Sequence, residues 1–141
     1  MNRSMLLAAL LIAALPASSA ERLFLEVSPQ NRDDLDNLFT TLEQSLDQSL
    51  PADDPVVVIL HGDEAFSFTR DHYLNNRTLI DRAARLDAYR MIEVRMCETW
   101  MKNNAIGPDD IPAFIEPVRF APEEIEMLEA EGYLPYDSVN I

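Results

Sequence analysis

The residue with the clearest chemical potential is Cys97, the single cysteine of the chain. It lies where an alternating apolar run, 91–96, gives way to a segment of helical composition, 97–104. Unpaired N–H groups and the helix dipole at a helix N-terminus favour a thiolate. The adjacent Glu98 and the acidic composition of the whole chain oppose one. Two interpretations therefore stay open, a nucleophilic thiol and a small buried apolar residue.

His61 is the second candidate, and it directly follows the apolar run 56–60. An imidazole in this place can act as a general base or as the partner of a Cys97 thiolate. The alternative is a strand-end histidine that is bonded to a backbone group. Gly62 and Asp63 follow His61 and are candidate ligand-binding residues.

Other polar and aromatic side chains near these positions give weaker indications. Trp100 is a candidate for lining a pocket, although such residues more often belong to a core or a subunit contact. A metal site would have to combine His61 with Asp63, Glu64 or His72, and their spacing matches no known metal signature. The sequence contains no P-loop, dinucleotide glycine fingerprint or Ser-His-Asp pattern, so we expect neither a metal nor a cofactor.

The elements that would position these residues alternate between strand and helix patterns. Strands are expected at 22–27, 56–60, 91–96 and 117–120, long helices at 33–49, 70–88 and 122–132, and short helical segments at 97–104 and 109–115. This order predicts an α/β fold with a mostly parallel, four-stranded sheet and helices on both faces. The tail 133–141 is expected either to dock on the body or to serve an interface.

Ligands of such sheets bind beyond the carboxyl ends of the strands. His61 and Cys97 follow the second and third expected strands and should therefore lie at the same edge. We expect the Cys97 thiol to be partly exposed there, in a pocket near His61.

The first 20 residues have the pattern of a secretory signal peptide. Arg3 provides a positive charge, Met5–Leu15 is an unbroken apolar run, and small residues precede a cleavage site after Ala20. Cleavage would leave Glu21–Ile141 as one periplasmic or secreted domain. An uncleaved membrane anchor is the less favoured alternative, because the apolar run is too short to span a bilayer.

The charge balance limits the partners of the protein. The chain has 25 acidic and 11 basic residues, and its formal net charge is −14. Nucleic acids and anionic membrane surfaces both require a basic footprint, so we expect neither as a partner. A lone cysteine cannot form an intrachain disulfide, and stability must therefore come from packing.

Several short motifs together resemble the DsrE/DsrF-like family, and the resemblance covers nearly all of residues 21–136. They are His61-Gly62-Asp63, Cys97-Glu98-Thr99-Trp100, Glu124-Ile125 with Leu128, and Gly132-Tyr133. The resemblance implies a flavodoxin-like three-layer sandwich that assembles into trimers or hexamers. In the sulfur-relay members, a cysteine after a strand carries sulfur as a persulfide, and Cys97 is the position that matches it. Those members work in the cytoplasm with partner subunits, whereas this chain carries a signal-like leader.

Three functional hypotheses follow. The first is a periplasmic sulfur carrier or sulfurtransferase component that uses Cys97 and exchanges sulfur with donor and acceptor proteins. The second is a non-catalytic oligomeric binding or scaffold protein in which Cys97 is buried. The third is a metal or small-ligand binder built around His61 and Asp63. Self-association is expected in addition, because Met91 and aromatic residues of the tail provide surplus apolar surface.

Overall fold

The computed structural model describes residues 21–27, 32–47 and 54–136 of the 141-residue chain. In these ranges the chain forms a five-stranded parallel sheet with the order β4-β3-β2-β1-β5. The strands are β1 (Leu23–Val27), β2 (Val56–Leu60), β3 (Ile92–Cys97), β4 (Glu116–Val118) and β5 (Leu134–Pro135). The helices are α1 (Arg32–Asp47), α2 (Tyr73–Ala88), α3 (Glu98–Asn103) and α4 (Ala121–Ala130), with short 3-10 segments η1 (Asp63–Phe68), η2 (Arg70–His72) and η3 (Pro108–Asp110).

The central strands follow from their side-chain patterns. All five residues of β2, VVVIL, are buried, as expected of a parallel strand that is covered on both faces. In β3, the apolar residues Ile92, Val94 and Met96 point into the larger core. Glu93 and Arg95 alternate with them and are only partly buried. The sheet therefore has one strongly apolar face and one that is more polar at β3.

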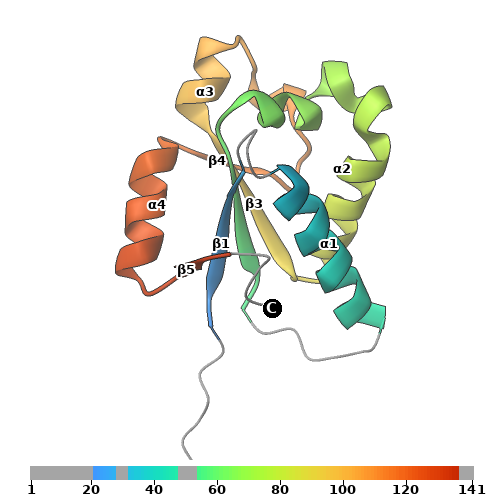
Figure 1. Ribbon diagram of the computed structural model, residues 1–141. Helices are drawn as coiled ribbons and strands as arrows, with labels where there is room; N and C mark the ends of the chain where they lie inside the picture. Colours follow the sequence, from blue (N-terminus) through green and yellow to red (C-terminus); the bar gives the residue numbers. More distant parts are fainter. Residues whose placement is uncertain (1–20, 28–31, 48–53, 137–141) are drawn as a thin grey trace, which may run out of the picture.

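Figure 1 shows α1 and α2 on one face of the sheet, α4 on the other, and α3 beyond the end of the strands. The larger core lies under α1 and α2, where Leu38, Phe39 and Leu86 are fully buried. A smaller core lies under α4 and is formed by Phe24, Val57, Ile59, Cys97, Ala121 and Leu128. The predicted α/β, flavodoxin-like arrangement with helices on both faces is confirmed.

The sheet has five strands, and the prediction of four was wrong. The start of the expected tail forms β5, which pairs with the edge of β1 through the register Leu23 with Leu134. The amide of Leu134 donates to the Arg22 carbonyl at 2.9 Å. β5 is only two residues long and contains Pro135, which is tolerated only at a sheet edge. Such a strand gives no recognisable sequence pattern.

A second correction concerns Met91. It is only 6% exposed and lies in the larger core, so it provides no surplus apolar surface. The expected leader, 1–20, and the last residues of the tail, 137–141, lie outside the described residues. Among the helices that the structure describes, none combines the length and apolar content that crossing a membrane requires.

Candidate functional site

The two principal candidates lie at the same edge of the sheet. The register of β2 and β3 pairs Leu60 with Met96, so His61 and Cys97 are each one residue beyond this pair on neighbouring strands. Cys97 is both the last residue of β3 and the N-cap of α3, which confirms the predicted junction. The alternation of β2 and β3 also places both residues on the α4 side of the sheet.

The Cys97 side chain is buried, and the expectation of partial exposure was wrong. The residue is 3% exposed and belongs to the smaller core, where it packs with Ala121 and Leu128 of α4. The physical reason is the position of α4, which crosses this face between β4 and β5 (Figure 1). Access to the sulfur therefore requires α4 or its neighbours to move.

His61 is paired with a carboxylate that sequence analysis did not single out. Its Nε2 lies 2.7 Å from Oε1 of Glu26 on β1, and the two side chains are 29% and 45% exposed. The alternative, a strand-end histidine bonded to a backbone group, is not observed for Nε2 of His61. β1 and β3 lie on opposite sides of β2, so this bond directs the imidazole toward β1 and not toward Cys97. The available signal was Glu26 itself, a charged residue inside the apolar strand LFLEV.

Directly after His61, the Glu64 side chain folds back onto the backbone at Gly62. The Gly62 amide donates to Oε1 of Glu64 at 2.9 Å. The other carboxylate oxygen, Oε2, is buried and has no hydrogen-bond partner among the described residues. A Cβ at position 62 would lie 2.7 Å from this oxygen, which explains why a glycine fits here. Asp63 is exposed, and it lines neither the pocket beside Arg70 nor the one beside Arg82.

Trp100 has a packing role that links the two cores. It contacts both clusters, and its ring meets Phe66 edge-on with 4.8 Å between ring centroids. Phe66 in turn lies 5.6 Å from the ring of His72. His72 Nδ1 lies 2.9 Å from the Thr69 hydroxyl, so this bond spans the short segment η2 that precedes α2.

A partly buried ion cluster fixes α4 to the sheet next to Cys97. Arg95 of β3 donates to Glu93 Oε1 at 2.7 Å and to Oε1 of Glu124 on α4. The Arg95 and Glu124 side chains are 18% and 17% exposed. Burial disfavours the charge of Arg95, but the hydrogen bond to Glu93 and the two carboxylate charges outweigh it, and the pKa of Arg95 is raised above its ordinary value. The Arg95 guanidinium therefore keeps its positive charge.

A metal site would need several ligand side chains close together. In the part of the chain that the structure describes, no three His, Cys, Asp or Glu side chains lie close enough together to hold an ion. His61 and Asp63 therefore do not form a metal centre with a third ligand from these residues.

The comparisons with known proteins bear on the fold. No family model matches the chain, and a search of the curated proteins finds no match. The structure is similar to that of MTH1491, a protein of unknown function from Methanobacterium thermoautotrophicum, with a TM-score of 0.60 and 15% sequence identity. The similarity covers 83% of this chain and 98% of MTH1491. At this level of identity the two proteins share a fold, and nothing further follows.

Proposed function

We propose that the protein is a periplasmic sulfur-handling protein that holds sulfane sulfur on Cys97. The observation that supports this proposal is the common position of Cys97 and the His61–Glu26 pair. All three lie toward the carboxyl edge of neighbouring parallel strands, where α/β sheets usually bind their ligands. The resemblance of the motifs at His61 and Cys97 to the DsrE/DsrF-like family points to the same chemistry.

The transfer step would take place between the Cys97 thiolate and a persulfide donor. The thiolate attacks the outer sulfur of R–S–SH, the donor S–S bond breaks, and Cys97–S–SH and R–S⁻ are formed. His61 follows the neighbouring strand and would accept the thiol proton, which requires the thiol to be brought to the imidazole, because the bond to Glu26 directs the ring away from Cys97. The Glu26 carboxylate would then stabilise the resulting imidazolium. Because Cys97 is buried, this step requires a displacement of α4.

The second candidate function is a non-catalytic binding or scaffold protein. The 3% exposure of Cys97 within an apolar cluster supports it, since free cysteines are often small buried hydrophobes. In this alternative the His61–Glu26 pair only fixes β1 to the end of β2.

Intact-mass spectrometry of the folded protein after treatment with polysulfide distinguishes the two functions. The sulfur-carrier function predicts a gain of sulfur atoms on the native protein, and Cys97→Ser should abolish it. His61→Gln should slow the reaction without abolishing it. If an alkylating agent labels Cys97 only after denaturation and no sulfur is added to the native protein, the carrier proposal fails and the scaffold function stands.

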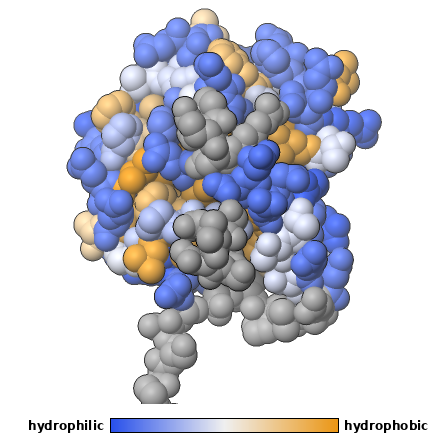
Figure 2. All heavy atoms as spheres, in the orientation of Figure 1, coloured by the Kyte–Doolittle hydropathy of each residue, from blue (hydrophilic) through white to orange (hydrophobic). Residues whose placement is uncertain are grey.

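Self-association and export belong to the same proposal. Phe120, Met127 and Leu134 are 46%, 53% and 48% exposed, and they lie at the start of α4, within it and in the β5 strand that follows. Figure 2 shows hydrophobic residues among hydrophilic ones on the α4 side of the molecule. A homotrimer or hexamer would cover this apolar surface. Light scattering tests assembly, and N-terminal sequencing of the exported protein tests cleavage after Ala20.

A further inference from the structure

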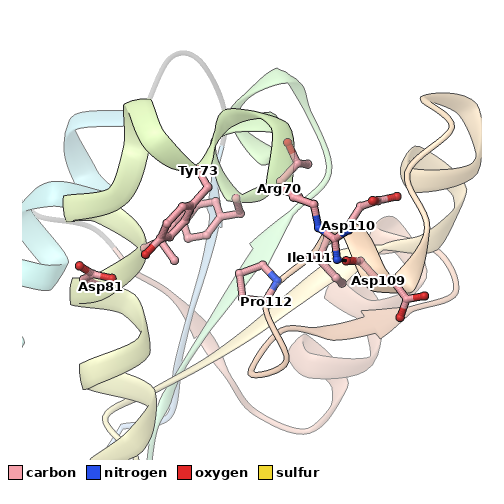
Figure 3. A pocket seen from close by; sticks show the side chains of 10 residues that line it. Arg70, Tyr73, Asp81, Asp109, Asp110, Ile111 and Pro112 are labelled. Atoms are coloured by element: carbon pink, nitrogen blue, oxygen red, sulfur yellow. Dashed lines mark hydrogen bonds between the residues drawn. The ribbon is translucent and has the colours of Figure 1, made fainter.

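A pocket beside α2 is formed by residues that the sequence did not indicate as a site. It lies between the start of α2 and the segment that leads from α3 to β4 (Figure 3). Its volume of about 350 Å³ is at the lower end of the range for small-molecule sites, roughly 300 to 1,000 Å³. The apolar part of its lining comes from Phe68, Tyr73, Ile80, Ile111 and Pro112.

Hydrogen bonds hold the two walls of this pocket in place. The Arg70 guanidinium reaches across and donates to the backbone carbonyl of Asp109 at 2.6 Å. Asp110 accepts a bond from the Gly107 amide at 2.8 Å, which fixes the turn that carries Ile111 and Pro112. The pocket is therefore formed before any ligand binds, and a ligand would lose little free energy in ordering it.

The charges of the lining favour a cation. Three carboxylates, of Asp81, Asp109 and Asp110, line the pocket together with one cation, Arg70. Arg70 donates to a neutral carbonyl and offsets at most one carboxylate charge, so the lining keeps a net negative charge. Figure 3 shows Tyr73 and Asp81 on the same side of the pocket, with Arg70 on the opposite side. The side of Tyr73 and Asp81 combines a carboxylate with an aromatic side chain, and both attract an ammonium group.

We propose that this pocket binds a small organic monocation with an apolar body, in the chemical class of the arylalkylamines. The ammonium group would lie between the Asp81 carboxylate and Tyr73, and the apolar body would lie against Ile111 and Pro112. Asp81 is available for this role, because its contact with Arg77 is 3.5 Å long and both side chains are more than half exposed. The inference does not depend on the sulfur chemistry of Cys97.

The test is a titration of the purified protein, followed by amide NMR, with three probes of the same shape. Phenethylamine is positively charged, phenethyl alcohol is neutral and hydrocinnamate is negatively charged. Phenethylamine should bind saturably and shift the amides around Tyr73 and Ile111, with an affinity about threefold to fivefold above that of the alcohol. Hydrocinnamate should bind weakest. Equal affinities for the three probes, or no saturation by the amine at millimolar concentration, would overturn the proposal.

Two substitutions locate the site. Asp81→Asn should weaken amine binding about threefold to fivefold and leave alcohol binding unchanged. Asp71→Asn is the matched control, because Asp71 is exposed in η2 and does not line the pocket. Ile111→Trp should fill the cavity and reduce the affinity for both probes, with folding checked by circular dichroism. If Asp71→Asn weakens amine binding as much as Asp81→Asn, the attraction comes from the overall charge and the site is not the pocket.

Discussion

Arg95 of β3 and Glu124 of α4 form an ion pair across the smaller core, and both side chains are more than four-fifths buried. Because Glu93 shares the same guanidinium, the pair belongs to a cluster of three charges. α4 also provides Ala121 and Leu128, which pack in the same core as Cys97. The ion pair therefore holds in place the helix that covers the candidate thiol.

Glu124→Gln should make Cys97 more reactive. A hydrogen bond to a charged partner contributes about 1.5 to 3 kcal/mol, and losing 1 to 2 kcal/mol of that would raise the population of an opened α4 by roughly five- to thirtyfold. The rate of alkylation of the native protein, followed by mass spectrometry, should rise accordingly. Glu123→Gln is the control, since Glu123 is exposed and its ion-pair partner among the described residues is Arg119, one turn before it. Equal rates for both variants would show that α4 does not limit access.

Cys97→Ser should destabilise the protein more than Cys97→Ala. Serine places a hydroxyl in an apolar cluster, at a cost of about 1 to 3 kcal/mol, which is reduced if the hydroxyl accepts a bond from the free amides of α3, because position 97 is the N-cap of that helix. Alanine loses only the contacts of the sulfur. Denaturant unfolding of the two variants measures the difference. A serine variant as stable as the alanine variant would mean that the hydroxyl at position 97 finds a partner, either the free amides of α3 or water.

Gly132, which follows α4, and Gly62, which precedes η1, should respond differently to alanine. Gly132 has φ +89°, a conformation that a side chain disfavours, and Gly132→Ala should lower the free energy of unfolding by about 1 kcal/mol or more. At Gly62 the added methyl group would meet only the end of the flexible Glu64 side chain. Its carboxylate can move outward, so Gly62→Ala should cost less. Thermal unfolding of the two variants compares them, and the reverse order would contradict this assignment.

The sequence was sufficient for the elements with strong patterns. VVVIL predicted a strand buried on both faces, and the alternation at 91–96 predicted a strand that is covered less completely on one face. The positions of His61 and Cys97 at one edge of the sheet followed from the order of the elements. These features depend on local periodicity, which is visible in a single sequence.

The sequence did not predict the features that depend on contacts between distant residues. The burial of Cys97 results from packing by α4, and β5 exists because Leu134 meets β1. The Glu26 partner of His61 lies 35 residues away in the chain. The pocket of Figure 3 joins α2 to a turn near Pro112, and no local pattern connects them. Tertiary contacts of this kind are not encoded in hydrophobic periodicity.

Asp87 provides a prediction about pH. Burial raises the pKa of this carboxyl above its ordinary value of 3.8, and the negative charge of Glu93 adds to the effect. A carboxyl whose pKa is raised on folding contributes stability below its unfolded pKa, and this contribution is lost as the pH rises through the folded pKa. At neutral pH the ionised Asp87 is therefore destabilising. Its position in the last turn of α2, at the negative end of the helix dipole, acts in the same direction.

Asp87→Asn should consequently raise the melting temperature at pH values above the folded pKa of Asp87, neutral pH included. The gain should shrink as the pH is lowered and should disappear below the unfolded pKa of 3.8, where Asp87 is protonated in both the folded and the unfolded state. Calorimetric melting curves of wild type and variant across this range measure the difference. Asp71→Asn, at an exposed position, is the control and should show no comparable gain. A gain that is the same at every pH would mean that the amide improves packing and that the charge of Asp87 has no part in it.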